Sequence, residues 1–318
     1  MNILVTGAAG FIGSHLCEFL WERGHSLVAL DCFNDYYDPR IKRHNITKLF
    51  RQPRYELIEG DILDERLLST IFQKHSFDAI IHLAARAGVR PSITQPTLYE
   101  KVNISGTMNL LERARQHRVP KFIFGSSSSV YGENRKVPFS ENDPVDNPIS
   151  PYAATKKSGE LMCYTYHHLH GIAVSCLRFF TVYGPRQRPD MAIHKFTSLI
   201  ATGQKVPMYG DGTAKRDYTY ITDIVDGIWL ALENCASYHV YNLGESKTIE
   251  LRELVNLIQK NLGIEAKIEK LPIQPGDVPI TYADISRASR ELGYNPQVMI
   301  ASGIEKFVDW YKDVHKLK

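Results

Sequence analysis

The chain has 318 residues, of which 43% are hydrophobic and 23% charged, which is ordinary for a globular enzyme with one large α/β domain and a smaller lobe. A formal net charge of +3, no long basic run and no apolar stretch of membrane length argue against nucleic acid and membranes as partners. Met1 opens directly into a strand pattern, which argues against a signal peptide, and five scattered cysteines argue against a disulfide framework or a metal site and for a reducing, cytoplasmic setting.

The first predicted element is a buried strand at 2–6 that runs through a glycine-rich turn into a helix. The turn reads Gly7-Ala-Ala-Gly10-Phe-Ile-Gly13, and the helix keeps apolar residues on one face until Gly24. Glycine lets the backbone approach a phosphate closely, and the start of a helix attracts negative charge. This pattern predicts a binding site for a dinucleotide pyrophosphate.

The second predicted strand, 27–31, ends in Asp31, where a carboxylate would bind a ribose 2′-hydroxyl and repel a 2′-phosphate. Three basic residues come soon afterwards, but they follow a loop: Arg40, Lys42 and Arg43. The sequence therefore predicts NAD, not NADP, as the cofactor.

Further apolar strands alternate with helical patterns through the first half of the chain. The strands are predicted at 55–61, 77–85, 122–127 and 174–180, and the helices at 63–74, 98–117 and 152–170. Repeated strand–helix–strand units predict an α/β fold of the Rossmann type, a doubly wound parallel sheet that binds ligands at the carboxyl ends of its strands.

Beyond residue 180 the pattern changes. We expect loops over much of 181–188 and 207–217 and another at 272–279. We also expect a helix at 249–262, with Thr248 as its cap and Gly263 after it, and a strand at 238–243 that can return to the parallel sheet. We therefore divide the chain into an NAD-binding domain, 1–180 with a returning segment near 215–245, and an interwoven, smaller C-terminal α/β lobe, mainly 181–318, for the substrate.

The candidate catalytic residues are Ser127, Tyr152 and Lys156. Ser150 and Pro151 suit the start of a helix, so Tyr152 and Lys156 lie four residues apart on one helical face. An isolated tyrosine and lysine four residues apart on a helix usually just mark a face exposed to solvent. Here a nucleotide-binding turn precedes it and Ser127 ends a sheet strand, so we expect the Lys156 ammonium, with the positive nicotinamide, to lower the pKa of Tyr152 and make it a base for a sugar hydroxyl.

Several motifs in order resemble the extended short-chain dehydrogenases/reductases along the whole chain. They are the glycine turn, Asp61-Ile62, His82-Leu-Ala-Ala85, Ser126-Ser-Ser-Ser-Val-Tyr-Gly132, Tyr152-x-x-x-Lys156, Arg216-Asp-Tyr-Thr-Tyr-Ile-Thr-Asp223 and Pro275-Gly-Asp-Val-Pro279. Within that family, two stretches are similar to UDP-glucuronate 4-epimerases: Phe33-Asn-Asp-Tyr-Tyr-Asp-Pro39 and Arg178 to Ala192.

The resemblance implies binding roles that spacing alone does not give. The cofactor set comprises Gly7, Gly10, Phe11, Ile12, Gly13, Asp31, Asn34, Asp61, Ile62, Leu83, Ala84, Ala85, Asn103, Tyr152 and Lys156. The set for a UDP-sugar comprises Arg86, Ser127, Ser128, Ser129, Thr181, Arg188, Met208, Tyr209, Arg216 and Asp277. Simpler roles compete: Asp61 as a turn residue, Met208 in core packing, Arg216 as a surface charge and Asp277 in an ordinary loop.

The implied reaction is NAD-dependent 4-epimerisation of UDP-glucuronate to UDP-galacturonate through a 4-keto sugar. Ser128 and Ser129 stand where dehydratases of the family have an acidic pair, and Arg188 with Thr181 would hold the C6 carboxylate, unless Arg188 only pairs with Asp190. Arg186-Gln187 and Arg86 depart from the usual family residues. Epimerisation of neutral UDP-sugars (UDP-glucose/UDP-galactose or N-acetylhexosamines), decarboxylation of UDP-glucuronate and a non-catalytic NAD sensor remain alternatives.

The resemblance also suggests a homodimer formed through the helices at 98–117 and 152–170. Met162, Tyr166 and Leu169 are candidate contact residues, although core packing explains them equally well.

Overall fold

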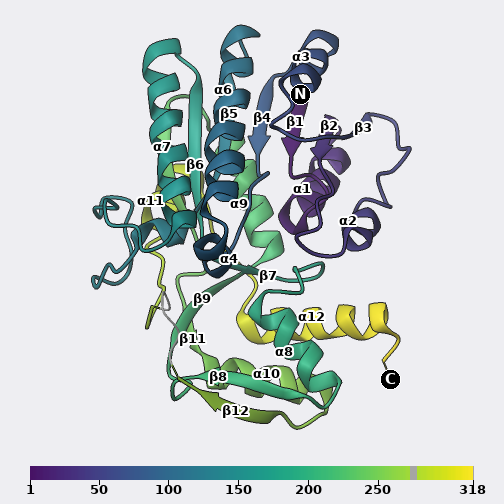
Figure 1. Ribbon diagram of the computed structural model, residues 1–318, viewed down its shortest axis with the longest axis vertical. Helices are drawn as coiled ribbons and strands as arrows, with labels where there is room; N and C mark the ends of the chain where they lie inside the picture. The colour runs from purple at the N-terminus through teal and green to yellow at the C-terminus, as the bar shows by residue number, and fades with distance from the viewer. Residues whose placement is uncertain (273–277, 318) are drawn as a thin grey trace.

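The computed structural model describes residues 1–272 and 278–317. Its centre is a parallel sheet of seven strands in the order β10-β6-β5-β4-β1-β2-β3 (Figure 1). The strands span β1 Asn2–Thr6, β2 Ser26–Asp31, β3 Tyr55–Glu59, β4 Ala79–His82, β5 Lys121–Ser127, β6 Ala173–Phe179 and β10 Tyr238–Leu243. The predicted Rossmann-type α/β fold is confirmed, including the return of 238–243 to the sheet beside β6.

Helices cover both faces of this sheet because its strands are apolar on both sides. α1 (Phe11–Glu22) packs against α9 (Ile221–Glu233) on one face, and α3 (Glu65–Lys74), α6 (Gly106–Gln116) and α7 (Pro151–His170) pack side by side on the other. Each face has its own buried cluster. Short helices complete the cofactor side of the molecule: α2 (Pro39–Asn45), α4 (Val89–Thr94), α5 (Pro96–Glu100), a π-helical turn (Lys101–Ser105) and a 3-10 turn (Ser128–Tyr131).

The C-terminal lobe combines two small sheets with helices. β7 (Thr181–Tyr183), β9 (Lys215–Tyr220) and β11 (Thr248–Glu250) form one sheet, and β8 (Lys205–Tyr209) pairs with β12 (Lys267–Leu271) in the other. The remaining helices are α8 (Ala192–Ala201), α10 (Leu251–Leu262), α11 (Ser286–Leu292) and α12 (Ile300–His315).

Several predicted boundaries were wrong. The expected loop at 207–217 contains the end of β8 and the start of β9, and the expected loop at 181–188 begins with β7. Thr248 lies in β11 and does not cap α10, whose N-terminal residue Glu250 makes no side-chain cap, whereas Gly263 ends the helix in the left-handed conformation as predicted. Each small strand is held by a partner distant in sequence, which local pattern does not reveal.

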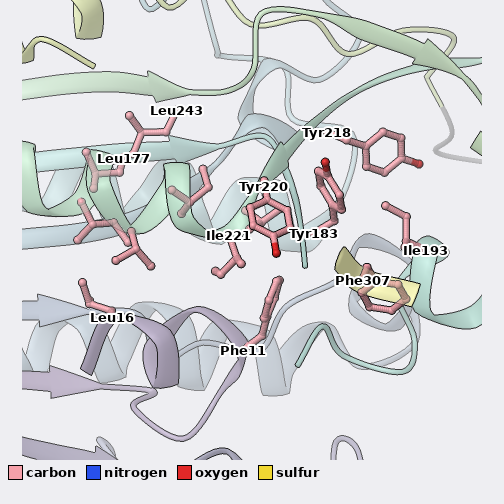
Figure 2. Close-up of a cluster of buried hydrophobic side chains, with 14 of the residues drawn as sticks. Phe11, Leu16, Leu177, Tyr183, Ile193, Tyr218, Tyr220, Ile221, Leu243 and Phe307 are labelled. Atoms are coloured by element: carbon pink, nitrogen blue, oxygen red, sulfur yellow. The ribbon is translucent and has the colours of Figure 1, made fainter. Parts of the chain in front are cut away.

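One hydrophobic core runs from the parallel sheet into the lobe. Figure 2 shows Phe11 and Leu16 of α1 in the same cluster as Tyr183 of β7, Tyr220 of β9 and Phe307 of α12. The lobe is thereby packed directly onto the helix that begins at the glycine turn. Among the residues that the structure describes, no helix is long and apolar enough to cross a membrane.

We expect Glu245→Gln to stabilise the protein at pH 8 and not at pH 5. Burial, with Asp223 and Asp217 nearby, raises the pKa of Glu245 to about 7, with partial relief from Lys247, and its Oε2 has no hydrogen-bond partner. Ionisation of Glu245 therefore costs the folded state stability as the pH rises from about 4.5 through 7. Thermal unfolding should show a midpoint a few degrees above wild type at pH 8; an equal gain at pH 5 would contradict the titration.

Candidate active site

A cavity of about 920 Å³ opens at the carboxyl ends of the sheet strands, where this class of fold binds ligands. It brings together most of the residues that the sequence selected. The lining includes Gly7, Gly10, Phe11, Ile12, Gly13, Asp31, Asn34, Asp61, Ile62, Leu83, Ala84, Ala85, Arg86, Ser127, Ser128, Ser129, Tyr152, Lys156, Thr181, Arg188 and Arg216.

The glycine turn has the shape that a dinucleotide needs. Gly7 has a φ of +69°, and a Cβ there would lie 2.8 Å from the Ala84 backbone nitrogen. A Cβ at Gly13 would lie 2.1 Å from the Gly7 carbonyl oxygen. Gly10 precedes α1 without a side-chain cap, so the first N–H groups of the helix remain available to a pyrophosphate. These residues fit NAD.

Lys42 corrects the expectation that the basic residues after β2 stay away from the cofactor site. Its Nζ lies 3.2 Å from Asp31 Oδ1, and both side chains are more than nine-tenths buried at the cavity wall. Asp31 also accepts hydrogen bonds from the backbone N–H groups of Ala9 at 3.1 Å and Phe33 at 2.9 Å. The ribose-side carboxylate is therefore held rigidly by three donors. The loop of residues 32–38 returns α2 to the sheet, and local sequence gave no signal for that.

We expect Lys42→Met to destabilise the protein by about 3–5 kcal/mol, because removing one partner leaves a buried charge uncompensated. Chemical denaturation measures the free energy of unfolding, and extraction of the purified protein measures its NAD content, which should fall as well. Arg40→Met is the matched control, since the Arg40–Asp38 pair is exposed and should not affect stability measurably. Equal unfolding free energies for the two variants would exclude a structural role for Lys42.

Not every residue of the predicted cofactor set faces the cavity. Asp61, Ile62 and Ala84 line it, whereas Asn103 is buried behind it. The Asn103 side chain accepts a hydrogen bond from the Arg86 N–H at 2.8 Å, donates to the Arg86 carbonyl at 3.0 Å and donates to Thr155 Oγ1 at 3.0 Å. Asn103 therefore fixes the Arg86 loop to the helix that carries Tyr152.

The catalytic candidates meet where β5 ends and α7 begins. Ser150 caps α7 by accepting a hydrogen bond from the Ala153 N–H at 3.1 Å, and Pro151 follows at the first helical position, as predicted. The Tyr152 and Ser127 side chains lie close together in the cavity wall, and Ser129 donates a hydrogen bond to Ser127 at 2.9 Å. A proton on a bound hydroxyl therefore has a short route to the Tyr152 oxygen.

The expected electrostatics around Tyr152 hold only in part. Burial raises the pKa of Tyr152, and the Ser127 hydrogen bond and the Arg188 charge offset this rise without reversing it. Burial also lowers the pKa of Lys156 to about 8, and its Nζ donates to the Gly125 carbonyl at 2.6 Å. In the protein alone, Lys156 thus does not lower the pKa of Tyr152 below its ordinary value, which leaves that effect to the ligands.

A buried ion pair stabilises the end of β5. Arg178 on β6 binds both carboxylate oxygens of Glu160 at 2.8 Å, and Glu160 accepts a further hydrogen bond from Ser126 Oγ at 2.7 Å. Because Ser126 immediately precedes Ser127, this network fixes the position of Ser127.

Arg188 lies in the cavity wall beside an acidic neighbour. It lines the cavity and also pairs with Asp190, through Nε at 2.9 Å and Nη2 at 2.8 Å. Burial lowers the pKa of Arg188, but the ion pair with Asp190 raises it above the ordinary value, so the guanidinium stays charged. With Arg86 and Thr181 in the same lining, this end of the cavity is suited to a carboxylate.

A second cavity of about 440 Å³ adjoins the first in the C-terminal lobe. Arg216 lines both, Tyr209 lines the second, and the Tyr209 ring lies 5.0 Å from the Arg90 guanidinium carbon. Met208 is buried in the hydrophobic core beside Gly212, which agrees with the simpler packing role. Asp277 lies outside the described residues.

Sequence reasoning missed the aromatic residues near Arg188, although it named Asp190 as an alternative ion-pair partner. Tyr36, Tyr37 and Asp190 all line the main cavity, and Tyr99 stacks edge-on against Tyr152 with ring centroids 6.2 Å apart. The run at 33–39 marked a resemblance without indicating that its tyrosines reach the site.

Comparisons with known proteins agree with this geometry. UDP-glucuronate 4-epimerase 4 of Arabidopsis thaliana is 45% identical over 98% of this chain and 75% of its own length. UDP-glucuronate 4-epimerase of Thermodesulfobacterium geofontis is 42% identical over 98% of this chain and 96% of its own. The crystal structure of UDP-glucuronic acid 4-epimerase from Bacillus cereus, in complex with UDP-glucuronic acid and NAD, superposes with a TM-score of 0.93 at 40% identity, covering 99% of this chain and 100% of that one.

The family model described as GDP-mannose 4,6 dehydratase matches residues 4–307. Together with the glycine turn, the Tyr152–Lys156 helix and the seven-stranded sheet, this match shows that the chain belongs to the GDP-mannose 4,6 dehydratase family of extended short-chain dehydrogenases/reductases.

Proposed function

We propose that the protein is an isomerase that converts UDP-glucuronate to UDP-galacturonate by NAD-dependent epimerisation at C4. The observation that carries this proposal is one cavity with three parts: a dinucleotide turn, the neighbouring Tyr152 and Ser127 side chains and the Arg188 guanidinium. The Bacillus cereus relative, crystallised with NAD and UDP-glucuronic acid, supports it.

In this proposal, Ser127 accepts and donates hydrogen bonds to orient the C4 hydroxyl, and Tyr152 takes its proton. When bound, NAD supplies the hydride acceptor and a positive charge beside Tyr152. Lys156, whose ammonium donates to the Gly125 carbonyl, adds a second positive charge. After the keto sugar has rotated in the site, Tyr152 returns its proton to the C4 oxygen. Gly7, Gly10 and Gly13 bind the pyrophosphate of the cofactor, and Asp31 its adenosine ribose.

The substrate carboxylate requires its own support. A uronate oxidised at C4 is a β-keto acid. It loses carbon dioxide when the C5–C6 bond is parallel to the π orbitals of the C4 carbonyl. We assign Arg188 and Thr181 to hold the carboxylate out of that alignment, and Arg216 and Tyr209 to bind the UDP part. Ser128 and Ser129 provide no carboxyl group for eliminating water, which favours epimerisation over the dehydration that the family description names.

The test is incubation of the purified protein with UDP-glucuronate, without added NAD, followed by separation of the nucleotide sugars. UDP-galacturonate with unchanged total uronate is the expected result. UDP-xylose with carbon dioxide would mean a decarboxylase, conversion of UDP-glucose alone would mean that Arg188 does not bind a carboxylate, and no conversion of any sugar would support an NAD sensor.

We also propose the division into an NAD-binding domain (1–180, with 215–245) and a substrate lobe, a cytoplasmic setting and a homodimer. Free cysteines throughout the described residues support a reducing compartment. On α7, Leu161 is 55% exposed and Leu169 is 64% exposed, which supports a contact face there, whereas Met162 and Tyr166 pack partly against the sheet-side core.

We expect Leu161→Glu to convert a homodimer to a monomer of 36.2 kDa, because a charge at the centre of an apolar interface must be desolvated. Light scattering after gel filtration measures the mass. Met299→Glu, at an apolar residue that is 48% exposed and outside α6 and α7, is the control and should keep the wild-type mass. A Leu161→Glu protein that stays dimeric would place the interface elsewhere.

A further inference from the structure

The loop of residues 32–38, between β2 and α2, reaches from the ribose end of the cavity to its sugar end. Its backbone is fixed at several points: Asp31 accepts a hydrogen bond from the Phe33 N–H at 2.9 Å, Asn34 accepts from the Tyr36 N–H at 3.2 Å, and Asp38 caps α2. Tyr36 therefore enters the cavity from a structured loop, although nothing in the reaction described above uses it.

The Tyr36 ring lies close to two guanidinium groups. Its centroid is 5.8 Å from the Arg86 guanidinium carbon and 5.4 Å from that of Arg188. Two cations in one cavity repel each other, and each is attracted by the negative face of an aromatic ring within about 6 Å. The ring therefore favours an arrangement in which both arginines remain near one point.

The Tyr36 hydroxyl connects the same residues to the catalytic helix. It lies near the Tyr99 hydroxyl and the Asp190 carboxylate, which is the ion-pair partner of Arg188. Tyr99 in turn donates to the Ala87 carbonyl at 2.6 Å, next to Arg86 in sequence, and its ring stacks against Tyr152. A Cβ at Gly88 would lie 2.9 Å from the Tyr36 oxygen, so the Arg86 loop approaches this hydroxyl directly.

We propose that Tyr36 is a positioning residue that holds Arg86 and Arg188 as a paired site for the carboxylate of a uronate. The proposal rests on the function proposed above and extends it from one arginine to two, with an aromatic ring that sets their spacing. Tyr36 thereby determines what happens to the 4-keto uronate. With the carboxylate held, the C5–C6 bond stays out of line with the C4 carbonyl; with it loose, that bond breaks, its electron pair enters the carbonyl as an enolate, carbon dioxide leaves and C5 takes a proton from water.

The test compares Tyr36→Leu and Tyr36→Phe with wild type, each assayed for KM, for the ratio of pentose to uronate products and for NAD content. Tyr36→Leu removes the ring, so we expect KM for UDP-glucuronate to rise roughly tenfold and the decarboxylated share to increase. Tyr36→Phe keeps the ring and should restore most of both values. NAD content should stay at the wild-type level in both variants, which separates arginine positioning from a general loss of structure.

Phe50→Leu is the matched control for the product ratio. The Phe50 ring also lies near an arginine, 5.3 Å from the Arg51 guanidinium carbon, but it is exposed and outside the cavity lining. We expect the wild-type ratio of pentose to uronate from Phe50→Leu. A Tyr36→Leu protein with wild-type KM and product ratio overturns the positioning role while leaving the proposed function intact, whereas a wild type that does not convert UDP-glucuronate overturns both.

Discussion

Replacing Tyr152 with phenylalanine should lower kcat for UDP-glucuronate by about 10³-fold or more, because a proton acceptor in the reacting position contributes about 10²–10⁴-fold and no neighbouring group replaces it. Tyr152 is partly buried, and its side chain lies beside Ser127 in the cavity wall. The substitution removes the hydroxyl oxygen and keeps the ring that packs against Tyr99. The fold and the cofactor cavity should therefore persist, and the variant should still contain NAD.

Product formation at saturating substrate and NAD content after denaturation measure the two parts of this expectation. Tyr166→Phe is the matched control, since it makes the same change on the same helix at a hydroxyl that is 3.0 Å from Glu112. We expect the control to stay within about twofold of wild-type kcat. A Tyr152→Phe enzyme within tenfold of wild type would exclude Tyr152 as the base.

Replacing Arg188 with alanine should have the second largest effect. It should change the KM and the identity of the product more than the rate of oxidation at C4. A charge-assisted, bidentate contact to a carboxylate is worth about 1.5–3 kcal/mol, so KM for UDP-glucuronate should rise roughly 10- to 100-fold. The 4-keto sugar should then lose carbon dioxide, because Arg86 alone does not hold the carboxylate from two sides.

Separation of uronate from pentose products, with trapping of released carbon dioxide, measures this effect. Arg188→Lys is the informative comparison, because it keeps the charge and loses the planar fork, and it should fall between alanine and wild type. An Arg188→Ala enzyme that releases only UDP-galacturonate with an unchanged KM would show that the carboxylate is held elsewhere.

The sheet and α7 could be predicted because their signals are local. An apolar run predicts a buried strand wherever it falls, and Ser150 with Pro151 marks the start of α7 from two adjacent residues. β8 and β9 escaped prediction because their pairing with β12, and with β7 and β11, depends on residues up to about sixty positions away. Their own sequence reads as a loop with Pro207, Gly210 and Gly212.

The site residues that could be predicted are those that belong to contiguous sequence motifs. Gly7 to Gly13, Ser127 and Tyr152 each belong to a motif that the chain carries whole, and all of them line the cavity. Lys42 and Tyr36 reach it only because the loop after β2 folds back, and Asp190 because the loop after β7 does. The expected effect of Lys156 on Tyr152 assumed a nearby ammonium acting with bound NAD, and in the structure this ammonium donates to a backbone carbonyl on β5.

The place of β10 at the end of the sheet has a consequence for the nascent chain. β6 is complete at Phe179, but the strand that covers its outer edge comes more than fifty residues later, at Tyr238–Leu243. During synthesis at about 5–20 residues per second, that edge stays open for several seconds and presents unpaired N–H and C=O groups to other nascent chains. Messages truncated between these two strands should therefore yield aggregates, and a chaperone that covers β6 should raise the yield of full-length protein.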